Sequence, residues 1–204
     1  MRATKEMFMA FINEFLDQLY TYGKLRVTLP DGTIVDAIGF DVEENGVTYQ
    51  VWRAEKYIYQ NGTLSGEVSL SGFTNSNSNL YYHLGQGGEE GEAPGPLVGQ
   101  AIIIGIDLTN YSYLDFSALA SSNSYWGSET YCKYGIDSAN NTLFSYEGYK
   151  DSDASPISYA KTMDVSAYTG VHNFIFECKV HAATTNEQYI SDMDLYVSSI
   201  RLYN

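Results

Sequence analysis

The chain has 204 residues, of which 11 are Lys or Arg and 25 are Asp or Glu, so its formal net charge is −14. A chain this acidic does not bind a phosphate backbone by counterion release, which argues against nucleic acid and against an anionic membrane surface as partners. Hydrophobic residues make up 44% of the chain, enough for a packed core. Its 19 Tyr, 18 Gly and 4 Pro are typical of a β-rich protein with many tight turns.

Residues 3–22 form the first segment with a regular pattern. Apolar side chains recur at nearly every fourth position and predict a helix that ends at Gly23. The apolar stripe of this helix includes Phe8, Phe11, Phe15 and Leu19. A stripe this wide needs a large apolar surface, and two alternatives are equally open: the sheet that follows, or neighbouring copies of the same helix. These residues are therefore candidates for oligomerisation or attachment.

The N-terminal region has no run of apolar residues long enough for targeting or membrane insertion. Its longest run, Met7 to Ile12, is shorter than the core of a signal peptide. It is far shorter than the roughly 20 residues of a membrane-spanning helix. We therefore expect a soluble protein without an export signal.

From residue 24 the apolar pattern switches to a period of two, which is typical of β-strands. Three turn signals follow: Pro30-Asp31-Gly32, Glu44-Asn45-Gly46 and Gln60-Asn61-Gly62. Asn-Gly favours the primed turns that join hairpin strands. The pattern predicts an antiparallel meander with strands over 33–43, 47–56, 57–60 and 63–73. Helix and meander together form a predicted N-terminal module over residues 1–73, which would attach or oligomerise the protein.

Residues 74–96 have a different composition. A tract of Asn, Ser and Thr covers 74–79, and a Gly-rich tract with three glutamates covers 85–96. Such segments bury little, and the glutamates repel one another. We therefore predict a flexible linker over 74–96.

Residues 97–204 show only strand-like patterns. The apolar run 101–106 is typical of a buried strand. Strands are predicted near 98–108, 111–118, 130–136, 142–146, 158–163, 172–182 and 195–202. Short strands separated by turns are the pattern of a β-sandwich or jelly roll. The predicted fold class is therefore mainly β: an N-terminal helix with a small antiparallel meander, a flexible linker and a C-terminal jelly-roll β-sandwich over 97–204.

Four residues of this second module have predicted structural roles. Cys132 and Cys178 are too few for a disulfide scaffold. They form either one bridge or, as we favour, two reduced thiols packed as small apolar groups. Asp107 and Asp164 each precede a Thr or Ser and a tight turn, where a carboxylate accepts backbone N–H bonds. We therefore predict a structural rather than a catalytic role for both aspartates.

Residue patterns for catalysis are sparse. The sequence has no zinc-binding, nucleophile-elbow or phosphate-loop motif, and its three histidines are His83, His172 and His181. We therefore expect no enzymatic activity and no cofactor. Asp151 with Asp153, and Asp192 with Asp194, leave a structural calcium ion as a minor hypothesis, and solvated loop acids are the favoured alternative.

Aromatic side chains are the strongest candidates for binding. Flat rings with polar neighbours suit sugar rings and protein interfaces alike. Tyr125 and Trp126, in a loop of Ser, Asn and Gly, are predicted to contact a glycan, with packing as an equally weighted alternative. Packing is favoured for the other tyrosines of this module: Tyr111, Tyr113, Tyr131, Tyr134, Tyr146, Tyr149, Tyr159, Tyr168, Tyr189, Tyr196 and Tyr203.

Three stretches of the second module together resemble a known group of proteins. They read IDLTNYSYLDF (106–116), MDVSAYTGVHNFIF (163–176) and LYVSSIRL (195–202). Their order resembles the jelly-roll, galactose-binding-like β-sandwiches at the C-terminal end of bacteriophage tail, baseplate and fibre proteins. Carbohydrate-binding modules of bacterial enzymes look similar. The resemblance covers roughly half of the chain and argues for the fold better than for the function.

The resemblance implies a bacteriophage virion structural protein, a component of the tail, baseplate, fibre or head decoration, whose sandwich binds a host-surface polysaccharide. Its partners would be other virion proteins and further copies of itself. By analogy with fibre-like appendages, we expect a homotrimer with the N-terminal helices on the threefold axis. The alternative is a carbohydrate-binding or adhesin module of a bacterial cell-surface or secreted protein. That alternative would normally carry a secretion signal, so the first hypothesis is favoured.

Overall fold

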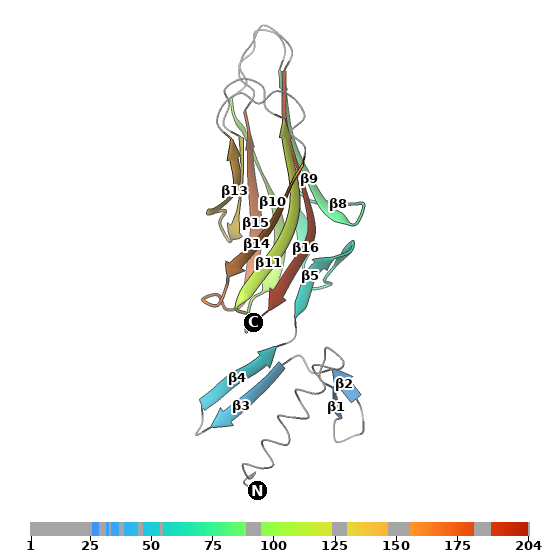
Figure 1. Ribbon diagram of the computed structural model, residues 1–204, viewed down its shortest axis with the longest axis vertical. Coiled ribbons are helices and arrows are strands. Elements are labelled where there is room, and N and C mark those ends of the chain that lie inside the picture. The colour runs from blue at the N-terminus through green and yellow to red at the C-terminus, as the bar shows by residue number, and fades with distance from the viewer. Residues whose placement is uncertain are drawn as a thin grey trace. The chain divides into compact units, whose positions relative to one another are not determined.

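The computed structural model describes residues 26–28, 32, 34–36, 39–44, 47–53, 55–88, 95–123, 130–146, 156–181 and 189–203. The chain divides into two compact units, one up to Glu55 and one from Lys56 to Tyr203. Every regular element in these residues is a β-strand (Figure 1). Within the same ranges, no helix is long and apolar enough to cross a membrane. The helix predicted over 3–22, with Phe8, Phe11, Phe15 and Leu19, lies outside them.

The first unit contains two described pairs of antiparallel strands. β1 (Arg26–Thr28) pairs with β2 (Ile34–Asp36), and β3 (Gly39–Glu44) pairs with β4 (Val47–Arg53). The first two predicted turn signals therefore lie between antiparallel strands. The two pairs form separate small sheets rather than the single meander that we predicted, and the remaining strands of that meander belong to the second unit.

The second unit contains all the strands that follow. They are β5 (Lys56–Gln60), β6 (Thr63–Leu64), β7 (Ser69–Ser71), β8 (Thr74–Ser76), β9 (Asn79–Gly88), β10 (Leu97–Asp107), β11 (Tyr113–Asn123), β12 (Thr130–Ile136), β13 (Asn141–Tyr146), β14 (Ile157–Asp164), β15 (Val171–Val180) and β16 (Tyr189–Tyr203). All seven strands predicted beyond residue 97 are present.

These strands form two antiparallel sheets. The five-stranded sheet has the order β13-β12-β15-β10-β7. The seven-stranded sheet has the order β14-β11-β16-β5-β6, and its two further strands are β9, which also pairs with β16, and β8, which pairs with β9. In Figure 1 the sheet with β11 and β16 lies in front of the sheet with β10 and β15. The second unit is therefore an antiparallel β-sandwich.

The pairing of the strands identifies the sandwich as a jelly roll. β9 pairs with β16, β10 with β15, β11 with β14, and β12 with β13. This nested pairing arises when a ribbon of eight strands is rolled into two packed sheets. The predicted C-terminal jelly roll is present, and its first strand is β9.

The structure differs from the prediction at the boundary between the modules. Residues 74–88, which we predicted as part of a linker, form β8 and β9 of the seven-stranded sheet, and the sandwich unit begins at Lys56. The reason is that buried and more exposed side chains alternate: Leu80, Tyr82 and Leu84 are buried, whereas Tyr81 is half-buried and His83 is exposed. Residues 89–94 of the predicted linker lie outside the described ranges.

Two tight hairpin turns shape one side of the seven-stranded sheet. The third predicted turn signal joins β5 to β6, and its Asn61 and Gly62 have φ values of 50° and 81°. Asn77 and Ser78, which join β8 to β9, have φ values of 48° and 64°. Two successive left-handed residues are the signature of the type I′ turn, whose twist matches that of the flanking strands.

The core between the two sheets is rich in aromatic side chains. Phe116 of β11 lies 5.4 Å from Phe174 and 5.3 Å from Phe176, both on β15 of the other sheet, measured between ring centroids. Its ring is also 4.8 Å from that of Tyr134 on β12. All these contacts are edge-to-face, an arrangement that aromatic pairs prefer. Phe116 is therefore a central contact between the sheets.

The two cysteines lie side by side in this core and are not bridged. Cys132 of β12 and Cys178 of β15 are register partners, both fully buried, with 3.5 Å between their sulfur atoms. The hydrogen bond from Cys178 and burial raise the pKa of the Cys132 thiol. The favoured prediction of two reduced, packed thiols is confirmed.

The predicted structural role of the two turn aspartates is also confirmed. Asp107 Oδ1 accepts the backbone N–H of Thr109 at 2.9 Å, and Asp164 Oδ1 accepts that of Ser166 at 3.0 Å. The pKa of each aspartate is lowered by the hydroxyl of the same residue and then by that N–H group. Gly170, with a φ of 92°, provides the left-handed turn before β15.

A histidine and an aspartate join the start of β15 to the turn between β12 and β13. His172 Nδ1 lies 2.7 Å from Asp137 Oδ2, and Asp137 Oδ1 accepts the backbone N–H of Asn173 at 2.9 Å. The Asn173 N–H and then His172 lower the pKa of Asp137. The hydrogen bond to Asp137 raises the pKa of His172.

These pKa shifts predict a pH window for the stability of this contact. The contribution of His172 is present below its unfolded pKa of 6.5 and is lost as pH rises through the higher folded value. The contribution of Asp137 is present above its unfolded pKa of 3.8 and is lost as pH falls through the lower folded value. Both contributions are therefore complete between about pH 4 and about pH 6.5.

Thermal melting of Asp137→Asn tests this window. We expect its deficit in Tm relative to the unaltered protein to be largest near pH 5 to 6 and to become smaller as pH rises through the raised pKa of His172, because the imidazole then loses its charge. Circular dichroism melts between about pH 3 and pH 9 measure the deficit. A deficit of the same size at every pH would contradict the ionic part of the contact.

Candidate functional site

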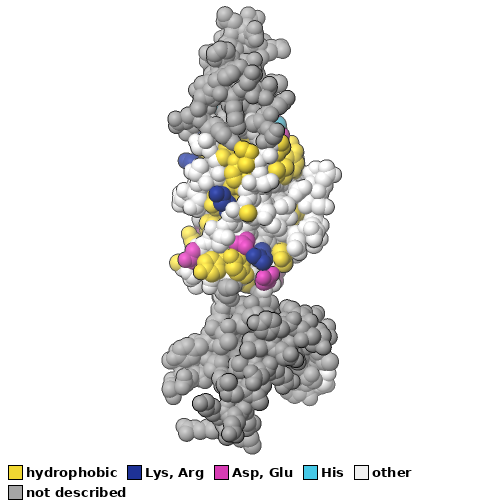
Figure 2. All heavy atoms as spheres, in the orientation of Figure 1, with side chains coloured by type: hydrophobic (Ala, Val, Ile, Leu, Met, Phe, Trp, Pro, Cys, Tyr) yellow, Lys and Arg dark blue, Asp and Glu magenta, His cyan; other side chains and the backbone are white. Residues whose placement is uncertain are grey.

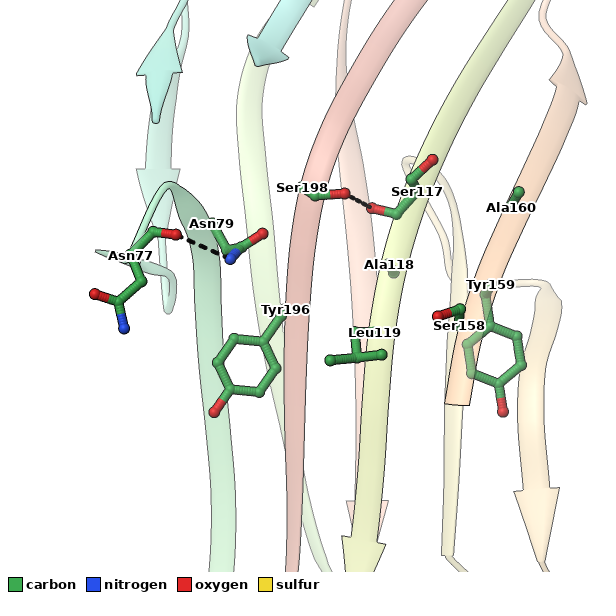
Figure 3. A pocket seen from close by; sticks show the side chains of 10 residues that line it. All are labelled: Asn77, Asn79, Ser117, Ala118, Leu119, Ser158, Tyr159, Ala160, Tyr196 and Ser198. Atoms are coloured by element: carbon green, nitrogen blue, oxygen red, sulfur yellow. Dashed lines mark hydrogen bonds between the residues drawn. The ribbon is translucent and has the colours of Figure 1, made fainter. Parts of the chain in front are cut away.

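The described part of the sandwich carries an open groove on the outer face of the seven-stranded sheet. Its volume is about 520 Å³, within the range of small-molecule sites. Figure 3 shows the side chains that line it: Asn77, Asn79, Ser117, Ala118, Leu119, Ser158, Tyr159, Ala160, Tyr196 and Ser198. They come from the β8–β9 hairpin and from β11, β14 and β16.

A β-bulge lies at the floor of the groove. Ser117 pairs with Ser199, whereas the next residue, Ala118, pairs with Val197, so Ser198 is the extra residue of β16. The Ser198 hydroxyl donates to the carbonyl oxygen of Ser117 at 3.3 Å. Bulges bend a strand and redirect its side chains, and they are common beside binding sites. The small Ser and Ala side chains around this bulge leave room for a ligand.

The β8–β9 hairpin forms one wall of the groove. Asn79 Nδ2 donates to the carbonyl oxygen of Asn77 at 3.1 Å across the turn. Asn75 joins the hairpin to its neighbour, since its Nδ2 donates to the Gly62 carbonyl at 2.9 Å and its Oδ1 accepts the Tyr59 hydroxyl at 3.2 Å. Tyr59 is fully buried, so the wall is anchored to the core.

A stacked pair of tyrosines stands beside this wall. The rings of Tyr81 on β9 and Tyr196 on β16 are 4.8 Å apart with an angle of 27° between their planes. The Tyr81 hydroxyl donates to Asp194 Oδ1 at 2.7 Å, and His83 Nδ1 lies 3.0 Å from the same oxygen. Burial and then the hydrogen bond to Asp194 raise the pKa of Tyr81. Asp194 thus holds Tyr81, and Tyr81 supports the ring of Tyr196.

The lining of the groove is aromatic and polar but uncharged. None of its ten side chains is Asp, Glu, Lys or Arg. Figure 2 shows the same face of the molecule, where most of the coloured and white surface is apolar or neutral and charged side chains are few. An open groove with a tyrosine ring, amides and hydroxyls can bind a neutral ligand that has both an apolar face and hydroxyl groups.

Both residues that we predicted to contact a glycan lie outside the described part of the structure. Tyr125 and Trp126 lie in the stretch 124–129, outside the described residues. Of the other tyrosines considered from the sequence, Tyr159 and Tyr196 line the groove. The ring of Tyr159 also stacks on Phe144, at 6.0 Å, so it has a packing role as well.

Of the two acidic pairs considered as calcium ligands, the structure describes only one. Asp151 and Asp153 lie outside the described residues, while Asp192 and Asp194 lie on β16. Among the residues that the structure describes, no three His, Cys, Asp or Glu side chains come together as metal ligands. A structural calcium ion therefore stays an untested hypothesis.

Sequence reasoning missed one wall of the groove. Asn77 and Asn79 belong to the polar tract that we interpreted as linker. The signal that could have found them is the alternation of Leu80, Tyr82 and Leu84 directly after a polar turn, because that alternation predicts a half-buried strand.

Comparison with known proteins finds only distant structural similarity. No protein-family model matches the chain, and no curated protein matches its sequence. A solved structure of infectious bursal disease virus, Gx strain, is similar with a TM-score of 0.41 and 9% identity, over 86% of this chain and 39% of that one. A carbohydrate-binding module of family 28, specific for non-crystalline cellulose, is similar with a TM-score of 0.35 and 10% identity, over 74% of this chain and 87% of that one.

A structure of the Gt strain of the same virus has a TM-score of 0.34 and 9% identity, over 86% of this chain and 43% of that one. The chain thus spans about two fifths of the length of the viral chains to which it is similar. Similarities at these TM-scores carry no functional argument.

Proposed function

We propose that the jelly roll is a glycan-binding module and that the groove beside Tyr196 is its binding site. The observation that carries this proposal is the uncharged, open groove on the outer face of the seven-stranded sheet, lined by tyrosine, amide and hydroxyl groups. Sugar rings present C–H faces that stack on aromatic rings, and hydroxyl groups that bond to Asn and Ser. The groove offers both kinds of contact side by side.

The charge of the chain favours neutral glycans over acidic ones. The lining contributes no positive charge, and the chain as a whole carries −14. An anionic polysaccharide would therefore be repelled over long range and would find no cation at the site. We propose a neutral polysaccharide as the ligand, bound without chemical change.

The biological setting that we propose is the virion of a bacteriophage, with the jelly roll displayed toward the host surface and the N-terminal module attaching it to other virion proteins as a homotrimer. The resemblance of residues 106–116, 163–176 and 195–202 to phage tail and fibre sandwiches supports this setting. The alternative is a carbohydrate-binding or adhesin module of a bacterial cell-surface or secreted protein. Neighbouring capsid and tail genes would distinguish the first setting from the second.

Replacing Tyr196 by Ala tests the binding site. On an array of neutral α- and β-glucans and of neutral and anionic bacterial polysaccharides, we expect the unaltered protein to bind neutral members. For its best ligand, Tyr196→Ala should lower the affinity at least about tenfold, which corresponds to about 1.4 kcal/mol. The loss follows from removing the ring on which the sugar stacks.

Two controls make this result specific. Tyr196→Phe keeps the ring and should retain most of the affinity. Tyr131→Ala removes a tyrosine of similar exposure from β12, in the other sheet, and should leave binding unchanged. Binding of Tyr196→Ala equal to that of the unaltered protein, or no bound glycan on the array, would contradict the proposal.

A further inference from the structure

A second cluster of aromatic and polar side chains lies on the same seven-stranded sheet. Strand pairing places its members in one row: Thr162 of β14 is opposite Asp115 of β11, Asp115 is opposite Arg201 of β16, and Arg201 is opposite Tyr57 of β5. In the next row, Tyr113 of β11 is opposite Tyr203 of β16. The cluster thus crosses four adjacent strands.

The polar members of this cluster hold each other in fixed positions. Asp115 Oδ2 accepts Arg201 Nη2 at 2.6 Å, and Asp115 Oδ1 accepts the hydroxyls of Thr162 at 2.8 Å and Tyr203 at 3.1 Å. Burial opposes the ionisation of Asp115, but these three hydrogen bonds outweigh it and lower its pKa. Asp115 is therefore an ionised anchor with its acceptor oxygens directed by three partners.

The aromatic members form a supported platform around this anchor. The Tyr203 ring has the Arg201 guanidinium 4.7 Å from its centroid and the Tyr113 ring 5.4 Å away at an angle of 31°. The side chains of Tyr57 and Tyr113 are 40% and 39% exposed. Two accessible rings thus flank a rigid polar centre, which is the composition of a sugar-binding surface rather than of a packed core.

We propose that Tyr57, Tyr113 and the Asp115–Arg201 pair form a second glycan-binding station, which holds the same neutral polysaccharide chain that occupies the groove at Tyr196. This inference rests on the proposed function of the groove. The ligand is then an extended chain lying along β11 and β16, contacted by tyrosine rings at both ends of its path.

The path between the two stations supports this arrangement. The six residue steps from Tyr113 to Leu119, which faces the groove, correspond to roughly 20 Å of strand. The register partners between them, Ser117 and Ser199, have small side chains and leave the surface open. Because the span exceeds a single sugar ring several times, only an oligosaccharide of several residues can reach both stations.

Glycan probes of different length distinguish binding at the groove from binding at the second station. The probes are a disaccharide to an octasaccharide prepared from the neutral polysaccharide that binds best on the array, measured by titration calorimetry. A short probe fills only the groove, whereas a long one reaches Tyr113. For Tyr113→Ala we expect an unchanged affinity for the disaccharide and a loss of about tenfold for the octasaccharide. Tyr113→Phe, which keeps the ring, should bind both as the unaltered protein does.

The outcomes distinguish this inference from the proposed function. Tyr196→Ala is expected to weaken binding of every probe length. If Tyr113→Ala and Tyr57→Ala both bind the octasaccharide as tightly as the unaltered protein while Tyr196→Ala does not, the second station is wrong and the groove remains. If no neutral glycan binds the unaltered protein, both are wrong. Melting curves of each variant show whether a loss of affinity comes from unfolding.

Discussion

Replacing Phe116 by Ala is expected to lower the free energy of unfolding of the sandwich by about 3–5 kcal/mol. Phe116 is 1% exposed, and its ring contacts three aromatic rings of the other sheet. Its removal would leave a cavity between the two sheets that rigid strands on both sides cannot close. Since small domains are stable by about 5–15 kcal/mol, this loss is a large fraction of the total.

Urea unfolding followed by circular dichroism measures this effect. Phe116→Leu keeps most of the apolar volume and should cost about 1 kcal/mol. Val171→Ala, at a side chain that is 69% exposed, should change the stability by less than about 0.5 kcal/mol. Equal, small losses for Phe116→Ala and Val171→Ala would contradict the packing of the two sheets through this residue.

Gly135→Ala is expected to destabilise the sandwich by about 3 kcal/mol. Gly135 lies in β12, just before the turn to β13, and a Cβ atom there would be 2.1 Å from the backbone oxygen of Ser138. Because that oxygen belongs to the main chain of a tight turn, it cannot move aside as a side chain would. The turn itself must open, which disturbs the β12–β13 pair at the sheet edge.

Two other glycines provide matched controls for this prediction. At Gly66 a Cβ would meet nothing within 4 Å, so Gly66→Ala should be nearly neutral. At Gly99 a Cβ would lie 2.1 Å from the Tyr82 hydroxyl, the end of a side chain, so Gly99→Ala should cost less than Gly135→Ala. Thermal melts of the three variants give the order. A Gly135→Ala protein as stable as Gly66→Ala would show that the turn is not built as described.

The strands of the jelly roll beyond residue 97 could be predicted because their signal is local. In β15, Phe174, Phe176, Cys178 and Val180 alternate with polar or less buried side chains, and all four are fully buried. That alternation is visible in the sequence as a period of two. The nested pairing of the strands could be expected only from the resemblance, since no single strand specifies its partner.

The strand β9 was missed because composition was given more weight than alternation. Its glycines and polar residues favour a linker when counted, but Tyr82 and Leu84 are each only 8% exposed. The pairing of Gly85 to Gly88 with β16 then depends on contacts more than one hundred residues away in sequence. Local composition cannot report such a partner.

Only the general chemical character of the binding surface, not the position of the groove, could be predicted from the sequence. The sequence indicated aromatic recognition by this module, but it assigned that role to Tyr125 and Trp126 and favoured packing for Tyr196. Its position beside Asn77 and Asn79 depends on the bulge at Ser198 and on the register between β9 and β16. Both are properties of strand pairing, so the lining of the groove becomes known only when the sheet is assembled.

The most direct test of the account is an NMR titration of the full chain with the neutral glycan that binds best on the array. We predict that the perturbed backbone amides lie on the outer face of the seven-stranded sheet, around Tyr196, Leu119 and the β8–β9 turn. The amides of β12 and β15, in the opposite sheet, should be unchanged. Perturbations centred on β12 and β15, or a complete absence of perturbation at saturating glycan, would contradict a binding site in this groove.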